Sequence, residues 1–352
     1  MIGTDQPVQV RQGEEVNLPV LNSYLLQLGL PIGPFTHQQQ FPGGYSNLTY
    51  LLHASAKEYI LRRPPVGAAI KSAHDMGREF KVLSLLKDHY SRIPTPIIHC
   101  EDPEVIGTPF YIMERIRGVI LRPDAVKHIG LSPEKMRAIS ESLVDNLVAL
   151  HTIDINKTGL VLLGKPDGYI QRQVEGWTKR YAMAQTDEIP EMEELNSWIK
   201  QNQPMDTAPT LLHNDYKYDN LVLQEKDLTE IIGVLDWEMA TVGDPWMDVG
   251  ASLAYWAQAG DGELAKVFNI SWLPGNLSRK EVVERYSIKS GRSIKSPVFF
   301  YVFGLYKNAV IAQQIYARWK QGHSKDPRFG QLIHVIHNLA QRGVRAVEKD
   351  SI

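Results

Sequence analysis

The hydrophobic and polar positions of residues 211–236 predict a strand, a polar loop and a strand hairpin. Two leucines precede the loop, Leu221–Leu223 follows it, and a polar turn separates that run from the apolar residues 231–235. Short apolar runs bounded by turn residues are typical of buried strands. Because a hairpin returns the chain, we expect Asp236 to come close to the loop.

The rest of the chain predicts a small sheet and amphipathic helices. Leucines recur on one helical face of residues 17–29, and a long amphipathic pattern covers residues 132–151. A further helix is expected to begin near Ser72, with Asp75 as a capping partner. Strands are expected at residues 38–40, 48–52, 58–63 and 109–114, and an apolar helix at 249–257.

Three oxygen-bearing side chains indicate a site for phosphoryl transfer. Asn220 follows Asp215 by five residues, and Asp236 ends the hairpin. One carboxylate can orient a substrate hydroxyl, while an amide oxygen and a second carboxylate can hold the magnesium that bridges nucleotide phosphates. A single Asp-Asn pair is usually turn chemistry. The three residues together favour Asp215 as a catalytic residue and Asn220 and Asp236 as metal ligands.

Lys217 is a second catalytic candidate in the same loop. It lies two residues after Asp215, where its ammonium group can stabilise charge on the transferred phosphoryl group. A solvated loop lysine is the alternative.

Two segments carry a family resemblance. HNDYKYDN at residues 213–220 and IIGVLDWE at 231–238 resemble the catalytic segment of the aminoglycoside phosphotransferase family, which includes choline kinases. Asn214 stands where the family pattern has Gly, a departure that affects backbone freedom but leaves the chemical groups in place. With the run from Arg62 to Glu79, the chain is more closely similar to kinase-like domains fused to some acyl-CoA dehydrogenases.

The resemblance covers roughly residues 30–310 and implies a fold of the α+β class. This is the two-lobe, protein-kinase-like fold, with a small antiparallel β lobe and a mainly helical large lobe. We expect the small lobe at residues 1–113, a hinge at 114–118 and the large lobe at 119–352.

The turn at residues 43–47 is, by resemblance, the loop that covers the nucleotide phosphates. Gly43 and Gly44 allow backbone amides to approach phosphates, and Ser46 and Asn47 add polar contacts. No GxGxxG motif is present, and a glycine-containing hairpin turn is the alternative.

Arg62 is predicted to contact nucleotide phosphates. In the family, its strand carries a basic residue that pairs with the phosphates and with a Glu on the next helix. Ile60 shares a strand face with Arg62 and is expected to pack on the adenine. Glu79 shares a helical face with leucines and therefore needs a partner, for which we predict Arg62. A solvent-exposed Glu79 is the alternative.

The resemblance also implies an adenine pocket at the hinge, where Met113 borders the pocket and backbone groups around Glu114 and Ile116 bond the adenine edge. After Asp236, the chain reaches Asp248 without room for a regulatory activation loop, which favours a small-molecule substrate.

Asp248 and His213 are predicted to support the loop and not to catalyse. Asp248 either caps the apolar helix that follows it or, by resemblance, bonds the backbone of the catalytic loop. A hydrolytic or metal site around His213 is not favoured, because no GxSxG or HExxH motif accompanies it.

Length and composition suit a two-lobe globular enzyme. The chain has 352 residues and one cysteine, Cys100, which excludes an internal disulfide and fits a reducing compartment. The amino end lacks the apolar core of a signal peptide, and the longest apolar stretch, at 298–306, is far shorter than the ~20 residues of a membrane span. We therefore expect a cytoplasmic protein with no membrane partner, and the oligomeric state stays open.

The charge distribution bears on the substrate. From residue 249 to the end there are fifteen Lys and Arg against seven Asp and Glu. No basic arm typical of nucleic-acid binding is present. The surplus is either solvated surface or a means to attract an anionic substrate. An aminoglycoside is a polycation, so it fits poorly.

The hypothesis is an ATP- and Mg²⁺-dependent phosphotransferase that acts on a hydroxyl group of a hydroxyacyl-CoA or hydroxy acid. An aminoglycoside or choline-type kinase is one alternative. A nucleotide-binding pseudokinase module without transfer activity is another.

Overall fold

The computed structural model describes residues 6–42, 47–55, 57–65, 75–126, 129–267, 269–324 and 326–352. The predicted phosphate-loop residues Gly43, Gly44 and Ser46 and the predicted helix start at Ser72 lie outside these ranges. The chain forms two compact units. The first comprises residues 1–120 and 221–238, and the second comprises 121–220 and 239–352.

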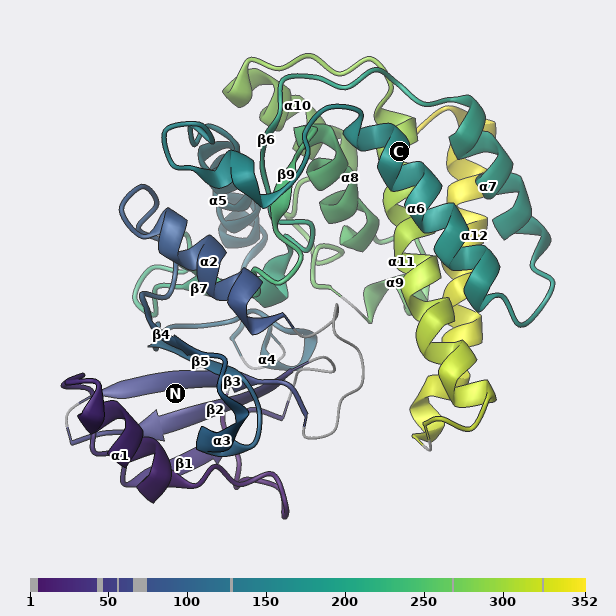
Figure 1. Ribbon diagram of the computed structural model, residues 1–352. Coiled ribbons are helices and arrows are strands. Elements are labelled where there is room, and N and C mark those ends of the chain that lie inside the picture. Colours follow the sequence, from purple (N-terminus) through teal and green to yellow (C-terminus); the bar gives the residue numbers. More distant parts are fainter. Residues whose placement is uncertain are drawn as a thin grey trace. The chain divides into compact units, whose positions relative to one another are not determined.

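The first unit is built on a five-stranded antiparallel sheet with the strand order β1-β2-β3-β5-β4 (Figure 1). Its elements are α1 (Leu18–Gln27), β1 (His37–Gln40), β2 (Leu48–His53), β3 (Glu58–Arg63), α2 (Met76–Leu86), β4 (Pro96–Cys100), α3 (Pro103–Ile106), β5 (Phe110–Glu114), β7 (Leu221–Leu223) and β8 (Ile231–Val234).

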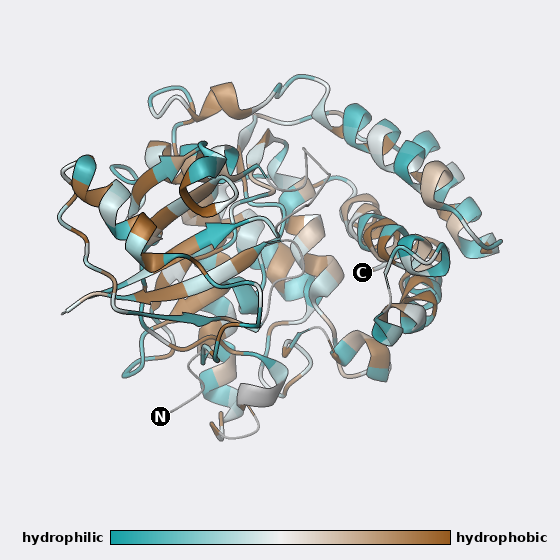
Figure 2. Cartoon of the chain, turned by 60° about the horizontal axis from the view of Figure 1, so that its bottom comes forward, coloured by the Kyte–Doolittle hydropathy of each residue, from teal (hydrophilic) through white to brown (hydrophobic). Residues whose placement is uncertain are grey.

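Alternation along the strands gives this sheet one apolar face, which α1 covers. Leu21 and Leu25 of α1 join Leu52, Leu61 and Ile112 in a single buried cluster. Burying each such side chain contributes about 1.5–3 kcal/mol. Figure 2 shows the hydrophobic colour concentrated along the strands. The opposite face carries Arg62 in register with Tyr111, so the polar candidates share a face that α1 does not cover.

The β7–β8 hairpin belongs to the first unit. Val119 and Leu223 exchange backbone hydrogen bonds of 2.8 Å, and the Val234 amide donates to Arg92. Gly118 allows this contact, because a Cβ there would lie 2.4 Å from the Leu223 carbonyl oxygen. The contacts divide the chain near residue 120, while the hinge at 114–118 and the lobe boundaries stay predictions.

The second unit is mainly helical, with a small sheet of β6 and β9. Its elements are α4 (Pro123–Val126), α5 (Pro133–His151), η1 (Leu160–Leu163), α6 (Tyr169–Ala184), α7 (Pro190–Gln201), β6 (Thr210–Leu212), η2 (Tyr218–Asn220), β9 (Thr241–Gly243), α8 (Pro245–Tyr255), α9 (Glu263–Lys266), α10 (Arg279–Ser290), α11 (Pro297–Lys320), η3 (Pro327–Gln331) and α12 (Leu332–Lys349).

Two glycines let α8 and α11 approach closely in this unit. A Cβ on Gly250 of α8 would lie 2.2 Å from the Phe300 carbonyl oxygen. A Cβ on Gly304 of α11 would lie 2.3 Å from the Gly250 carbonyl oxygen. The helices therefore pack backbone against backbone, which fixes the rest of α11 relative to α8.

The structure bears on two of the predicted helices and corrects the start of the second. The helix expected from Ser72 is described from Met76, with Asp75 as its N-cap. The helix expected from residue 249 begins at Pro245, because the Asp244 side chain accepts a hydrogen bond from the Trp246 amide and caps it. Asp248 therefore lies inside the helix and is free for another role.

Strand β4 and the helices α6, α7, α10 and α12 were not predicted. Within the ranges that the structure describes, no helix combines the length and apolar character needed to cross a lipid bilayer.

Candidate active site

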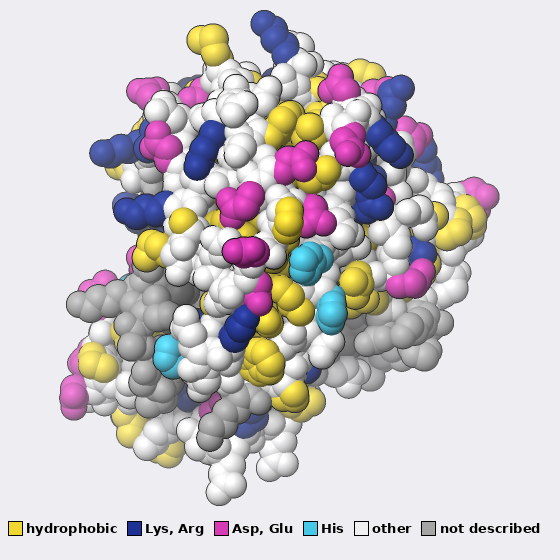
Figure 3. All heavy atoms as spheres, turned by 90° about the vertical axis from the view of Figure 1, so that its right-hand side faces the viewer, with side chains coloured by type: hydrophobic (Ala, Val, Ile, Leu, Met, Phe, Trp, Pro, Cys, Tyr) yellow, Lys and Arg dark blue, Asp and Glu magenta, His cyan; other side chains and the backbone are white. Residues whose placement is uncertain are grey.

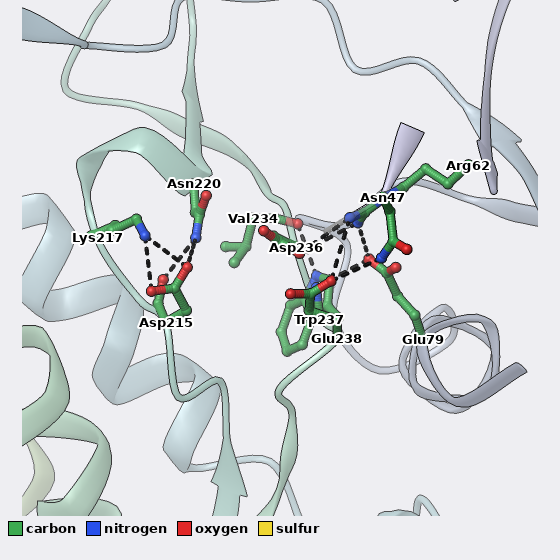
Figure 4. A network of polar contacts seen from close by, with 10 residues as sticks. All are labelled: Asn47, Arg62, Glu79, Asp215, Lys217, Asn220, Val234, Asp236, Trp237 and Glu238. Atoms are coloured by element: carbon green, nitrogen blue, oxygen red, sulfur yellow. Dashed lines mark hydrogen bonds and ion pairs between the residues drawn. The ribbon is translucent and has the colours of Figure 1, made fainter. Parts of the chain in front are cut away.

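The first unit contains a network of ionised side chains around Arg62, the predicted phosphate contact (Figure 4). The Arg62 guanidinium donates to Glu79 Oε1 at 2.5 Å, so the predicted pairing is present. Arg62 lies on β3 and Glu79 on the buried face of α2, only 1% exposed. A solvent-exposed Glu79 is therefore excluded.

Asp236 and Glu238 complete this network. Asp236 Oδ1 accepts from both terminal nitrogens of Arg62 at 3.4 Å, and Glu238 Oε2 lies 3.8 Å from Arg62 Nη2. Asn47 Nδ2 donates to Glu238 at 3.0 Å. We call these four side chains, together with Glu79, the Arg62 network. Glu238 was not predicted, although it directly follows the Asp-Trp of the motif.

The network holds more negative than positive charge. Burial alone would lower the pKa of Arg62, but Glu79, Asp236 and Glu238 outweigh it and raise that pKa well above its ordinary value. Burial raises the pKa of Glu79, against the opposing effect of Arg62. One guanidinium thus faces three carboxylates, and a cationic ligand would complete the set.

Asp236 has an uncommon backbone conformation. Its φ angle is 66°, in the left-handed region that few residues other than Gly adopt. The next amide, Trp237 N, donates to Glu79 Oε1 at 3.2 Å, and the Trp237 indole donates to Val234 O at 2.9 Å. These bonds hold the end of β8 in a conformation of the kind found at functional sites.

The predicted adenine contacts lie beside Arg62 in the same sheet. Ile60 of β3 is the cross-strand neighbour of Met113 of β5. The Glu114 amide donates to Thr95 O at 2.9 Å, so it is not available to an adenine. The Ile116 backbone makes no hydrogen bond within the described residues, and the adenine contacts of both residues stay predictions.

The other predicted residues lie in the second unit: Asp215 and Lys217 in the loop after β6, and Asn220 at the end of η2. Lys217 Nζ lies 2.9 and 2.8 Å from the two carboxylate oxygens of Asp215. Asn220 Nδ2 donates to the Asp215 side chain at 2.9 Å and to its carbonyl at 2.8 Å. Figure 4 shows the Asn220 amide oxygen pointing away from these bonds, which leaves it for a metal ion.

The side chain of Asp248 holds this loop by accepting hydrogen bonds from backbone amides of the loop. Its two oxygens accept from the amides of His213, at 2.6 Å, and Asn214, at 2.7 Å. His151 Nε2 lies 3.1 Å from Asp248, and His151 Nδ1 lies 2.7 Å from the Tyr286 hydroxyl. We call Asp248, His151 and the two loop amides the Asp248 brace. Of the two predicted roles of Asp248, the loop contact is confirmed.

Hydrogen bonds and nearby charges keep the Asp248 carboxylate of the brace ionised. Burial raises the pKa of Asp248, but the bonds from His151 and from the His213 amide outweigh it, and the net pKa is lowered. A fully buried carboxylate is costly unless it is paired in this way.

Tyr255, at the end of α8, was not predicted. Lys217 Nζ lies 4.5 Å above its ring. Burial and the Asp215 carboxylate raise the pKa of its hydroxyl, so it stays protonated. No local spacing pattern marks this tyrosine, because it approaches Asp215 only through the packing of α8.

The donor set suits a hard cation. Magnesium prefers carboxylate, amide and phosphate oxygens and keeps several waters, so it rarely has an all-protein cage. Within the described ranges no group of three His, Cys, Asp or Glu side chains is close enough to hold a metal by itself. The oxygen atoms of Asp236 in the first unit and of Asn220 in the second are of the type that magnesium accepts, and their role as metal ligands stays a prediction.

The family model described as the phosphotransferase enzyme family matches residues 37–282, which contain both networks. The chain belongs to this family.

Curated relatives of this phosphotransferase chain carry an additional part. This chain is 33% identical over 351 residues to acyl-CoA dehydrogenase family member 11 of Rattus norvegicus, and the match covers 97% of this chain and 44% of that protein. Family member 10 of Mus musculus is 33% identical over 312 residues, which cover 86% of this chain and 28% of the relative. The chain thus spans less than half the length of these relatives.

Solved structures share the fold of this phosphotransferase. A Ralstonia eutropha protein described as a “putative aminoglycoside phosphotransferase” matches with a TM-score of 0.81 and 29% identity, over 95% of this chain and 99% of that one. An ADP-bound aminoglycoside phosphotransferase matches with a TM-score of 0.56 and 16% identity, over 93% and 99%, which bears on the fold alone. The predicted kinase-like α+β fold is confirmed.

Proposed function

We propose that this chain is an ATP-dependent kinase that phosphorylates a hydroxyl group of a small metabolite. The observation that carries the proposal is the loop of the second unit, where Asp215 is bound by Lys217 and Asn220 and the backbone is fixed by Asp248. A fixed carboxylate with a neighbouring ammonium group is suited to orient a hydroxyl and offset phosphoryl charge.

The nucleotide would bind at the Arg62 network. Arg62 would contact the phosphates, Ile60 and Met113 would border the adenine, and residues 114–118 would act as the hinge. Asp236 and Asn220 would be the magnesium ligands, and the excess of carboxylates around Arg62 supports this role for Asp236. One solved structure with this fold is described as ADP-bound, and it serves as the precedent for nucleotide use in this proposal.

In the reaction, Asp215 would accept a hydrogen bond from the acceptor hydroxyl and take its proton as the oxygen attacks the γ-phosphorus of ATP, while the bond from that phosphorus to the β–γ bridging oxygen breaks and ADP leaves. Lys217 would neutralise charge that develops on the transferred group. Tyr255, which stays protonated, would keep its hydroxyl directed at Asp215. Magnesium, when bound, would supply charge neutralisation on the β- and γ-phosphates.

For the acceptor we propose a hydroxyacyl-CoA or hydroxy acid. The support comes from relatives that are named acyl-CoA dehydrogenases, since a fused kinase unit is expected to act on a related acyl substrate.

The basic carboxyl-terminal third supports this choice less than the sequence suggested. Eight of its described basic residues form ion pairs: Lys266, Arg279, Lys280, Arg285, Lys289, Lys320, Arg328 and Arg342. Figure 3 shows Lys and Arg interspersed with Asp and Glu on one face of the molecule.

Incubation with Mg-ATP and a panel of hydroxyacyl-CoAs, hydroxy acids, choline, sugars and aminoglycosides tests the proposal. Mass spectrometry would detect the added phosphoryl group. Transfer to a hydroxyacyl-CoA or hydroxy acid is expected. Phosphorylated kanamycin without any acyl product would favour the aminoglycoside alternative.

Asp215→Asn separates a kinase from a nucleotide-binding module. We expect turnover to fall by about 10²–10⁴-fold, the usual contribution of a general base, while Mg-ATP binding measured by calorimetry is retained. If the wild-type protein binds Mg-ATP but transfers phosphate to no acceptor, the binding-module alternative is correct.

A further inference from the structure

Lys307 of α11 is a buried cation behind the loop that carries Asp215. Lys307 is only 5% exposed to solvent. Its ammonium group donates to the Asn214 carbonyl oxygen at 2.9 Å and lies 5.8 Å above the Trp177 ring. Within the described part of the chain, Lys307 has no carboxylate at ion-pair distance. A buried lysine without a salt bridge is uncommon and requires a reason.

Asn214, the residue that Lys307 contacts, forms hydrogen bonds through its amide, its side-chain nitrogen and its carbonyl oxygen. Its φ angle is 65°, in the left-handed region. Its amide donates to Asp248 at 2.7 Å, and its side chain donates to Met239 O at 3.1 Å. The Lys307 bond fixes the carbonyl oxygen, and together with the bond from the Asp215 amide to His213 Nδ1 it holds the peptide plane that joins Asn214 to Asp215.

The position of Lys307 follows from the close crossing of α8 and α11. Gly304 contacts the Gly250 backbone, and Lys307 lies three residues, or about one helical turn, further along α11. Asp248 lies on α8, two residues before Gly250. The same crossing therefore brings the brace carboxylate and the Lys307 ammonium to Asn214.

The charge of Lys307 is unfavourable for folding. Burial lowers its pKa to about 8, with Lys217 and Arg180 acting in the same direction and Asp215 and Asp248 opposing. Since the pKa is about 10.4 in the unfolded chain, the unfolded state binds more protons between these values. The charged form thus lowers stability below pH 8, and that cost disappears as pH rises toward 10.

We propose that Lys307 is a positioning residue for Asp215, which it serves by fixing the Asn214 carbonyl oxygen and by placing a positive charge behind the carboxylate. This inference rests on the proposed kinase activity. It explains why the fold keeps a cation where an apolar side chain would be more stable, because stability is often lower where activity requires it.

Lys307→Met is the main test, with Lys179→Met on the exposed face of α6 as a control that removes the same charge. We expect kcat for the acceptor found in the panel to fall on the order of 10²-fold, as for a misplaced catalytic group, with KM for Mg-ATP unchanged. The thermal midpoint of Lys307→Met should not be lowered. If the thermal midpoint of Lys307→Met fell together with its kcat, Lys307 would be a merely structural residue, and the proposal would be overturned.

Lys307→Arg tests the charge through pH. In the wild type, kcat should decline above pH 8, where Lys307 loses its proton. Arginine keeps its charge at all these pH values, so Lys307→Arg should retain activity and lack the alkaline decline. An identical decline in both proteins would contradict the role of the Lys307 charge.

Hydrogen exchange provides a measurement that does not depend on activity. We expect amides in residues 213–216 to exchange faster in Lys307→Met than in Lys179→Met or the wild type. If the wild type transfers phosphate to no acceptor, the proposed function fails while this comparison still applies. Unchanged exchange in the loop would overturn the positioning role in either case.

Discussion

The Arg62 network and the Asp248 brace hold carboxylates in place by different means. In the first, side chains of opposite charge bond one another, with Arg62 on β3 facing Glu79, Asp236 and Glu238. In the second, a single buried carboxylate accepts hydrogen bonds from two backbone amides and from a histidine. The first arrangement sets local charge, and the second sets the shape of a loop.

This difference matches what each region is proposed to do. A network with an excess of negative charge can gain stability when a cation or nucleotide completes it, so it is suited to binding. A brace on backbone groups cannot be displaced by a ligand, so it is suited to hold Asp215 in one geometry. Substitutions should therefore affect binding in the first unit and loop geometry in the second.

Asp248→Ala is expected to have the largest effect on stability. It removes the acceptor of two buried amides and the partner of His151 Nε2, which should cost about 3–5 kcal/mol. Urea unfolding followed by tryptophan fluorescence would measure this, with exposed Asp88→Ala as a control. A loss equal to that of Asp88→Ala would show that the brace does not support the unit.

The pH dependence of the brace gives an independent check. The pKa of Asp248 is lowered in the folded state, so its contribution is present above the unfolded value of about 3.9 and is lost as pH falls through the lowered value. The difference in unfolding free energy between wild type and Asp248→Ala should therefore shrink below pH 4. A constant difference down to pH 2 would contradict this account.

Arg62→Met should be the most damaging change in the Arg62 network. It leaves Glu79 buried without a cation, at a cost of about 3 kcal/mol, and it should abolish Mg-ATP binding. The double variant Arg62→Met/Glu79→Met should recover part of the stability, since coupled buried pairs show about 0.5–3 kcal/mol of interaction energy. It should not recover nucleotide binding. Strictly additive stability losses would mean that the pair is not coupled.

Lys217→Met should reduce activity more than stability. The side chain is only 18% exposed and is paired with Asp215, so its loss should lower the unfolding free energy by about 1–3 kcal/mol, and the loss of activity should exceed what this destabilisation explains. The transfer rate should fall on the order of 10²-fold, because a charge beside the phosphoryl group is removed. Steady-state kinetics with the identified acceptor would measure it, and an unchanged kcat would remove Lys217 from the catalytic residues.

Asn214→Gly should have the smallest effect. Glycine relieves a left-handed conformation by about 1 kcal/mol, and the lost side-chain bond to Met239 costs about as much. Both the unfolding free energy and kcat should thus remain near the wild-type values. A large loss of kcat with unchanged stability would show that the side chain itself takes part in the reaction.

The sequence predicted contacts where local periodicity determines direction. Arg62 and Glu79 meet because strand alternation and helical spacing each turn one side chain toward the same polar face. The interval between Asp215 and Asn220 is short enough for a loop to join them directly. In both cases a few residues of local geometry are sufficient.

The sequence left alternatives open where it offered only a net charge or a motif. The surplus of basic residues after position 249 fitted either a solvated surface or an anion-attracting one, and eight of the described ones form ion pairs. Asp248 fitted both a helix cap and a loop contact, and only the position of Asp244 as the cap decided between them.

The sequence by itself determined the class of chemistry, because the loop and hairpin motif places carboxylate, amide and ammonium groups at spacings that phosphoryl transfer requires. The tertiary structure alone decided which distant groups support them. Lys307 lies 93 positions from Asn214, inside an apolar helix, and no pattern along the chain links the two. They meet because Gly250 and Gly304 let two helices pack backbone against backbone, and such packing depends on the shape of both surfaces at once.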